Sequence, residues 1–218
     1  MVCSKPYDLG PKGKPSGWIH NKSKVKLVRY AYDFIVTAAK KEKTAEAKEV
    51  IRDFGGIRGL ELSEEKTLIT HIDDGFDMLG WTFRKYNGKL IIKPSQKAIK
   101  AFKGSLSETV LRTGKAWEQG VLIKMPNQQL RGWANYHRSV CDAETLSKID
   151  HALFGLLWRW VKRRHPKKVR GWVAHKYWHQ KGSRHWVFSD WETDLWSLSY
   201  VPIVRHAKVR MKFLTTAV

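Results

Sequence analysis

Cysteine is nearly absent from this sequence of 218 residues, which contains only Cys3 and Cys141. Two cysteines are too few for a disulfide framework or for a zinc site built from cysteines. Long apolar runs are missing too. The longest, residues 152–158, is far shorter than the roughly 18–20 residues of a membrane span, and Arg159 ends it. Residues 1–17 lack the apolar core of a signal peptide. These absences predict a soluble protein with no membrane partner, in the bacterial cytoplasm or an organelle matrix.

Acidic residues are scarce as well. The chain carries 41 Lys and Arg against 20 Asp and Glu, a formal net charge of +21. The acids concentrate in residues 32–77, where 11 Asp and Glu outnumber 7 Lys and Arg. Residues 151–187 have none, but they hold 10 Lys and Arg, 5 of the 11 Trp and 5 of the 9 His. Because cations bind phosphates and aromatic rings stack on bases, this composition is typical of an RNA-binding surface.

The first part of the chain favours β-structure. Residues 25–36 alternate as a β-hairpin, and residues 41–54 have the apolar spacing of a helix that Gly55 and Gly56 end. Short strands are expected near residues 60–62, 68–72 and 76–79. A second hairpin is predicted over residues 81–93, since its Asn87-Gly88 pair suits a type I′ turn.

The second part has helical periodicity. Ser95 is the expected N-cap of a helix that runs to about Thr113, and two more helices are predicted, Asn127–Ser139 and Ala143–Arg164. The remainder is expected to be irregular, with short strands near residues 186–188 and 203–209. The predicted fold class is therefore α+β, in four stretches: an irregular segment 1–24, a β-rich part 25–93, a helical part 94–185 and a C-terminal segment 186–218.

Several motifs, in order along the chain, resemble group II intron-encoded reverse transcriptases, and they cover nearly everything after Lys24. Residues 28–34, Val-Arg-Tyr-Ala-Tyr-Asp-Phe, look like the Tyr-Ala-Asp-Asp hairpin of that family, and residues 58–67 and 75–81 look like its next palm blocks. The resemblance to its maturase-specific domain (domain X, the thumb) rests on residues 92–95, 131–138 and 157–166, and residues 199–206 are similar to the linker beyond it. The resemblance implies a partial palm over residues 25–93, domain X over 94–185 and a linker-like end over 186–218.

The hairpin tip departs from the family pattern. The family has two adjacent acids there, the first a metal ligand, whereas this sequence has Tyr32 followed by Asp33. A neutral phenol cannot replace a carboxylate on Mg²⁺. Asp33 is left as a residual catalytic acid and a weak Mg²⁺ ligand, and the family's fingers and first palm blocks have no counterpart here. We expect no polymerase activity from this chain alone, Mg²⁺ as a cofactor only if that activity is reconstituted, and no cofactor for RNA binding.

The candidate RNA-binding residues are cations of the helical part: Arg131, Arg138, Arg159, Lys162, Arg163, Arg164, Lys167 and Lys168. The first two share a helix face near Asn135, whereas Trp133 and Tyr136 fit a buried role instead. For the others an ordinary solvated helix end is the alternative. The resemblance implies that this domain binds the group II intron RNA and helps it fold for splicing.

Two alternative functions remain open on the sequence. The chain is either the second half of a split RNA-directed DNA polymerase, completed by an N-terminal reverse-transcriptase fragment, or a decayed, inactive remnant. His175 and His179 have the spacing of two zinc ligands on a helix, but no third ligand is evident, so a structural role is favoured. Cys141 is expected at a helix boundary and not as a nucleophile.

Overall fold

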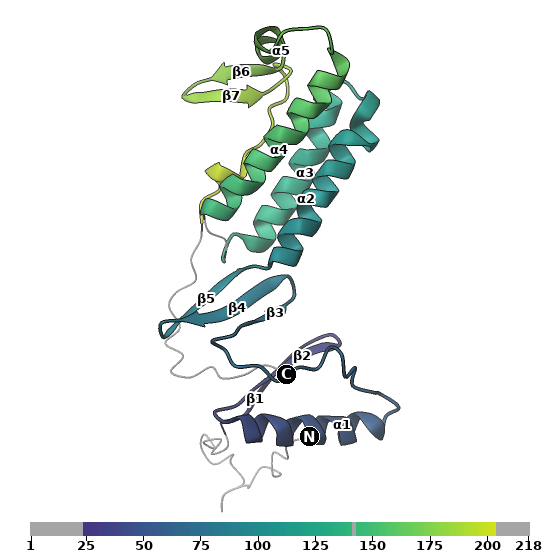
Figure 1. Ribbon diagram of the computed structural model, residues 1–218, viewed down its shortest axis with the longest axis vertical. Coiled ribbons are helices and arrows are strands. Elements are labelled where there is room, and N and C mark those ends of the chain that lie inside the picture. Colours follow the sequence, from purple (N-terminus) through teal and green to yellow (C-terminus); the bar gives the residue numbers. More distant parts are fainter. Residues whose placement is uncertain (1–23, 141–142, 204–218) are drawn as a thin grey trace, which may run out of the picture. The chain divides into compact units, whose positions relative to one another are not determined.

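The computed structural model describes residues 24–140 and 143–203 and has an α+β fold, as predicted (Figure 1). The chain divides into two compact units. Among the described residues, unit 1 comprises residues 24–76 and Phe83–Ile91, and unit 2 comprises Asp77–Thr82 and the residues from Ile92 onward. Four sequence-based expectations lie outside the described residues: the irregular segment before Lys24, Cys3, Cys141 and the strand expected near residues 203–209.

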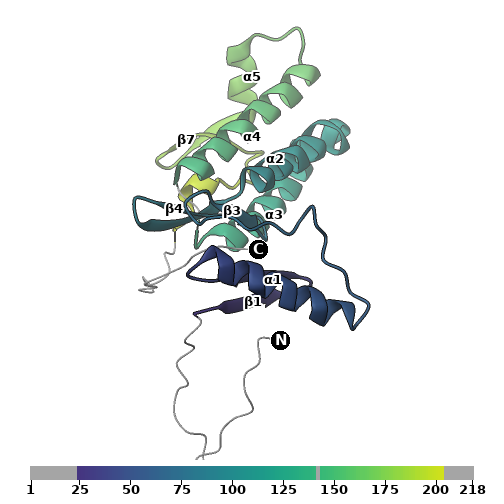
Figure 2. The same cartoon turned by 60° about the horizontal axis from the view of Figure 1, so that its bottom comes forward.

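A two-stranded hairpin opens unit 1, as its β-branched residues predict. Strand β1 (Lys26–Tyr30) pairs antiparallel with β2 (Asp33–Thr37), and Tyr30 faces Asp33 across the tip. Helix α1 (Lys41–Gly56) follows and lies beside this hairpin (Figure 2). The buried side chains that unit 1 contributes are few and small: Val36, Ala38, Thr44, Ala47 and Ile72.

The apolar stripe predicted on α1 is only partly covered. Ala47 is buried, but Val50 and Phe54 are 36% and 37% exposed. Phe54 is covered from outside by the guanidinium of Arg58, which lies 3.6 Å from the ring centroid. A helix whose apolar face remains this open gains little from hydrophobic burial within the described part of unit 1.

The strands expected near residues 60–62 and 68–72 are absent from the structure, so this prediction is wrong. The backbone there folds into local turns: Leu60 N–H donates to Gly55 O at 3.0 Å, and Thr67 N–H donates to Ser63 O at 2.9 Å. Gly59 allows the first turn with a φ of 67°. Residues 60–67 have no neighbouring strand to pair with, and turn hydrogen bonds satisfy the backbone instead. Further along, Ile72 O accepts a single hydrogen bond from Lys85 N–H at 2.9 Å, which forms no ladder.

The strand and hairpin predicted over residues 76–93 are confirmed. The structure has a sheet in the order β3-β4-β5, formed by Phe76–Met78, Trp81–Tyr86 and Lys89–Pro94. Asn87 and Gly88 have φ values of 46° and 79°, the two left-handed positions that a type I′ turn needs.

Three long helices form the core of unit 2. They are α2 (Gln96–Leu111), α3 (Gln119–His137) and α4 (Ala143–Arg164), with a short 3₁₀ turn η1 (Thr113–Ala116) between the first two. Ser95 caps α2 as predicted, because its Oγ accepts a hydrogen bond from Ala98 N–H at 3.1 Å. The predicted bounds of α4 are confirmed. The fully buried side chains of this core include Leu106, Val110, Leu122, Leu130, Ile149, Leu153, Leu157 and Trp160.

Helix α3 begins eight residues earlier than the sequence suggests. Pro126 lies inside α3, although proline lacks the N–H of the helical ladder. Leu122 and Ile123, only 0% and 1% exposed, anchor the turns before it in the core. Burial of these side chains offsets the single lost hydrogen bond, so tertiary packing overrides the local signal.

The chain beyond α4 is more regular than expected. Helix α5 (Arg170–Tyr177) and strand β6 (Trp178–Lys181) were not predicted, whereas β7 (Arg184–Phe188) includes the strand expected near residues 186–188. Strands β6 and β7 pair as an antiparallel hairpin. His175 lies in α5 but His179 lies in β6, so the two histidines do not share a helix face.

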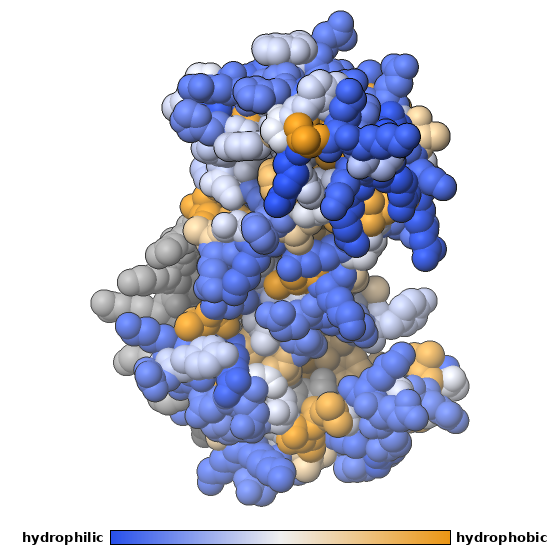
Figure 3. All heavy atoms as spheres, turned by 45° about the horizontal axis from the view of Figure 1, so that its top comes forward, coloured by the Kyte–Doolittle hydropathy of each residue, from blue (hydrophilic) through white to orange (hydrophobic). Residues whose placement is uncertain are grey.

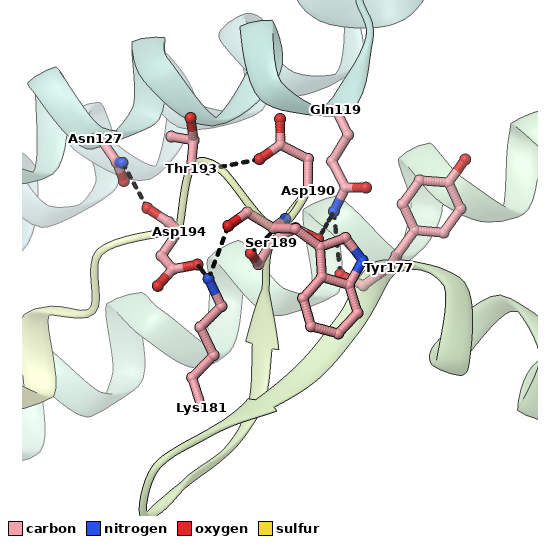
Figure 4. A network of polar contacts seen from close by, with 9 residues as sticks. Gln119, Asn127, Tyr177, Lys181, Ser189, Asp190, Thr193 and Asp194 are labelled. Carbon is pink, nitrogen blue, oxygen red and sulfur yellow. Dashed lines mark hydrogen bonds and ion pairs between the residues drawn. The ribbon is translucent and has the colours of Figure 1, made fainter.

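Polar side chains fasten the end of this hairpin to α3. The Gln119 amide donates to Tyr177 O at 3.1 Å and to Ser189 O at 2.9 Å, and the Asn127 amide donates to Asp194 O at 2.8 Å (Figure 4). After this loop a second 3₁₀ turn, η2 (Leu198–Tyr200), packs on α4. None of the described helices is long and apolar enough to span a membrane.

Candidate nucleic-acid interface

The candidate cations near the end of α4 stand on a rigid support. Trp160 is 1% exposed, and its Nε1 donates to Gly114 O at 2.8 Å, which ties α4 to the turn between α2 and α3. Arg159, Lys162 and Arg163 lie on the exposed side of the same turns. Figure 3 shows strongly hydrophilic side chains gathered over this end of unit 2. A fixed helix therefore presents these charges to solvent.

The structure separates these cations into two kinds. Arg164 donates through Nη2 to Trp117 O and, at 3.4 Å, to Lys115 O, and its guanidinium lies 4.0 Å from the centroid of the Trp160 ring. Arg163 Nη1 donates to Leu111 O at 3.2 Å. Both arginines thus bind carbonyls at the end of α2 and in the turn after it. Their charge is partly committed to the fold.

The remaining candidates of this region are open to a ligand. Arg159, Lys162, Lys167 and Lys168 are exposed. Within the described part of the chain, Arg159, Lys162 and Lys167 form no side-chain hydrogen bond or ion pair. Unpaired exposed ammonium and guanidinium groups are the natural partners of phosphates.

Aromatic rings lie among the cations on α5 and just before it. Lys168 and Lys176 approach the Trp172 ring to 5.1 Å and 5.2 Å from its centroid, and Arg170 lies 5.4 Å from that of Trp158. Trp172 is 40% exposed. We name this set, together with Arg159, Lys162 and Lys167, the basic-aromatic surface. Sequence reasoning did not single out Trp172 or Lys176, although the acid-free stretch contains both.

His165 sits beneath this surface. Its Nε2 is 2.8 Å from the Tyr177 hydroxyl, and its ring meets Trp172 edge-on at 5.0 Å. Desolvation lowers the pKa of His165 below its ordinary value, and the nearby charges of Lys176, Arg164 and Lys168 lower it further. The histidine is therefore neutral at pH 7 and acts as a hydrogen-bonding support.

Arg131 and Arg138 form a separate site. Arg138 caps the C-terminal end of α3, whereas Arg164 binds the carbonyls just before the start of that helix. Since α3 has 19 residues, the two ends are about 28 Å apart along its axis. The candidate cations consequently lie at opposite ends of the helical core (Figure 1) and form no single patch.

The rings that follow Arg131 are structural. Trp133 stacks on Phe102 at 5.2 Å, and the Tyr136 hydroxyl donates to Leu79 O at 2.7 Å. His137 is 3% exposed and accepts a hydrogen bond from Trp81 Nε1 at Nδ1, 2.9 Å away. Burial lowers the pKa of His137 to about 4. These contacts dock residues 79–81 onto α3 and leave Arg131, Asn135 and Arg138 exposed.

The hairpin of unit 1 offers little to a metal ion. Asp33 is exposed at the start of β2, and Tyr32 beside it is 95% exposed. The described residues contain no group of three or more His, Cys, Asp or Glu arranged to hold a metal. Mg²⁺ prefers several oxygen ligands at once. The described residues around Asp33 therefore do not fit a bound Mg²⁺.

Unit 2 is a basic, aromatic-rich helical domain. Residues 99–178 match the family model of the group II intron, maturase-specific domain. The match runs from the first turns of α2 to the start of β6, and it supports a group II intron maturase. The expected resemblance to the maturase-specific domain is confirmed for these residues. No curated protein matches the chain.

Proposed function

We propose that this chain binds group II intron RNA through unit 2 and assists the folding and splicing of that RNA. The observation that carries the proposal is the basic-aromatic surface, which lies on the segment that matches the maturase-specific domain. Positive charge offsets the repulsion between phosphates when RNA helices pack together. The protein contributes contacts and needs no chemistry of its own for this role.

Charge reversal on the basic-aromatic surface tests the proposal. The variant Arg159→Glu/Lys162→Glu/Lys167→Glu changes three exposed side chains and spares Arg163 and Arg164, which bind backbone carbonyls. We expect its affinity for a transcribed group II intron RNA to fall on the order of 100-fold at low salt. The slope of log affinity against log salt should become shallower by about two units, as filter binding would measure.

A matched control changes the same charge elsewhere. Lys41→Glu/Lys66→Glu/Lys89→Glu also alters three exposed cations, in unit 1, and lowers the net charge of +21 equally. Its affinity should fall much less. Equal losses for the two triple variants would show that net charge alone drives binding, and an affinity that is flat in salt would contradict the proposal.

A second candidate function rests on unit 1. Strand β1 is exposed along its whole length, and Leu27 and Val28 are 60% and 58% exposed. Apolar side chains and an open strand edge are features that a further polypeptide covers. They support the split-polymerase alternative, in which an N-terminal reverse-transcriptase fragment completes the palm in trans. Primer extension by the two-part complex, with and without Tyr32→Asp, tests it: no extension by either complex would exclude this role.

A further inference from the structure

An aromatic hollow lies beside the β6–β7 hairpin, within unit 2, and shares helix α5 with the basic-aromatic surface described above. It encloses about 460 Å³ and is lined by Ala174, His175, Trp178, His179, Gln180, His185, Trp186 and Trp191. Six of these eight residues have aromatic rings, and none is acidic. The volume lies within the range of about 300–1,000 Å³ that is usual for sites of small molecules.

Two tryptophans at this hollow are held in an unfavourable backbone conformation. Trp186 and Trp191 have φ values of 62° and 77°, in the left-handed region that bulky residues avoid. Their side chains are 61% and 69% exposed, so neither ring is placed there to fill the core. Strain of this kind persists only where neighbouring contacts impose it, and it is common at ligand-binding sites.

The contacts that hold Trp191 in this conformation belong to the polar network of Figure 4. Trp191 N–H donates to Ser189 Oγ at 3.0 Å, and Lys181 Nζ donates to Trp191 O at 3.3 Å. Lys181 also forms an ion pair with Asp194 at 2.6 Å. Because the loop is fastened on both sides of Trp191, the ring is displayed in one position.

One wall of the hollow is already a stack of rings. The imidazole of His179 lies 4.0 Å from the centroid of Trp191, with an angle of 27° between the planes. The three histidines of the lining offer ring nitrogens that hydrogen-bond to polar edges. A planar, polar-edged ring that stacks on Trp191 satisfies both features.

The charge around the hollow identifies the class of ligand. Residues 151–187 contain no acid, and Lys176, Lys181 and Arg184 lie on the elements that form the hollow. Three acids follow in the next loop: Asp194 is paired with Lys181, Asp190 accepts from Thr193 N–H at 2.6 Å, and Glu192 is exposed. Exposed aromatic faces with cations nearby, here Lys176 and Arg184, are the arrangement that binds single-stranded nucleic acids.

We propose that this hollow binds an unpaired nucleobase of RNA, which stacks on Trp191 and Trp186. The inference rests on the proposed RNA-binding function and gives it a second element. Cations on α4 and α5 bind the backbone without regard to pairing, whereas the hollow selects bases that are free of a duplex. A maturase built in this way distinguishes loops and bulges from helices.

The test uses the full chain and a short single-stranded RNA that carries one 2-aminopurine, with the same strand annealed to its complement as the paired probe. We expect binding to quench the 2-aminopurine fluorescence in the single strand. The variant Trp186→Gly/Trp191→Gly removes both rings and suits the positive φ values. It should bind the single strand about tenfold more weakly and the duplex as the wild type does.

Two controls separate a binding role from a structural one. Trp191→Phe retains a ring and should recover most of the affinity, whereas Tyr86→Ala removes an aromatic side chain of unit 1, 46% exposed, and should change nothing. The glycine variant should unfold no more easily than the wild type, since it loses strain and little buried surface.

The outcomes distinguish this inference from the proposed function. If the wild type binds intron RNA with a steep salt dependence but the glycine variant binds the single strand equally well, the hollow has another occupant and this inference is wrong. Unquenched 2-aminopurine in the bound single strand would overturn it as well. If the wild type binds neither probe nor intron RNA at low salt, the proposed function itself fails.

Discussion

Unit 1 and unit 2 differ in where they place their large apolar side chains. In unit 2, one hydrophobic cluster takes in side chains from α2, α3, α4, α5 and the β6–β7 hairpin. In unit 1 the buried side chains are few, while many large apolar ones are exposed among the described residues: Leu27, Val28, Tyr30, Tyr32, Ile57, Leu60 and Leu68. The first arrangement stabilises a fold, and the second presents surface.

The two units also differ in charge. The acids of residues 32–77 lie in or next to unit 1, where Lys48 and Arg52 pair with Glu64. Unit 2 concentrates cations without acids over residues 151–187. The cations of this surface repel one another, and a rigid core is needed to hold them in place. A thick core under a cationic surface therefore suits the binding of a large polyanion. Each prediction below tests this contrast.

The largest expected effect is on the core of unit 2. Trp160→Ala removes a side chain that is 1% exposed and leaves Gly114 O without its donor. We expect the free energy of unfolding to fall by about 4 kcal/mol. Val36→Ala, at the centre of the thin core of unit 1, should cost about 2 kcal/mol. Urea denaturation of both variants measures the difference.

The control is a second Trp→Ala change in unit 2. Trp186 is 61% exposed, so Trp186→Ala should leave the midpoint of unfolding near that of the wild type. Equal losses for Trp160→Ala and Val36→Ala would contradict the difference in core thickness.

Acid should weaken unit 2 through His137. Burial lowers the pKa of His137 to about 4, whereas the unfolded chain retains a value near 6.5. Well above pH 6.5, His137 is neutral in both the folded and the unfolded state, so its protonation does not reduce the free energy of unfolding. As the pH falls toward 4, the unfolded state binds a proton first, and the free energy of unfolding decreases. The loss between about pH 7 and about pH 5 is about 2 kcal/mol.

The measurement is the difference in unfolding between wild type and His137→Asn across that interval. Asparagine retains an acceptor for Trp81 Nε1 but does not titrate. Between about pH 7 and about pH 5, its free energy of unfolding should therefore fall by about 2 kcal/mol less than that of the wild type. Parallel pH profiles would show that His137 does not titrate differently in the two states.

Much of this contrast could be predicted from the sequence, and the exceptions have identifiable causes. Local signals sufficed for α4, with its apolar spacing and basic last turn, and for the Asn87-Gly88 turn. Helix α3 extends through Pro126 because Leu122 and Ile123 are buried by distant residues. The apolar residues around Leu60 and Leu68 are typical of strands, but no strand pairs with these segments.

The candidate site shows the same limit. The acid-free stretch drew attention to the cations of α4, and nothing local separates Arg164 from Lys162. The distinction depends on the carbonyl of Trp117, which lies 47 residues away in the sequence. The placement of the Trp186 and Trp191 rings likewise could not be predicted locally. It depends on their backbone angles and on a hollow formed by α5, β6 and β7.

A pair of Gly→Ala changes should have effects of opposite sign in the two units. Gly88, in the turn of unit 1, has a φ of 79°, which alanine adopts only with strain, so Gly88→Ala should destabilise by about 1 kcal/mol. Gly104 lies inside α2 with no atom within 4 Å of an added Cβ, so Gly104→Ala should stabilise by about 0.5–1 kcal/mol. Thermal unfolding compares them. A loss of stability in Gly104→Ala would show that this face of α2 is covered.

The smallest effect is expected for the ion pairs of unit 1. Hydrogen bonds from Lys48 and Arg52 hold the pKa of Glu64 below its ordinary value, so the pairs persist at neutral pH and are lost only in acid. Because all three side chains meet water, salt screens the attraction. Glu64→Gln should leave the amide exchange of α1 unchanged at about 0.15 M salt and speed it slightly at about 0.01 M. Fast exchange at both salt concentrations would mean that these exposed pairs, and not the few buried side chains of unit 1, hold α1 in place.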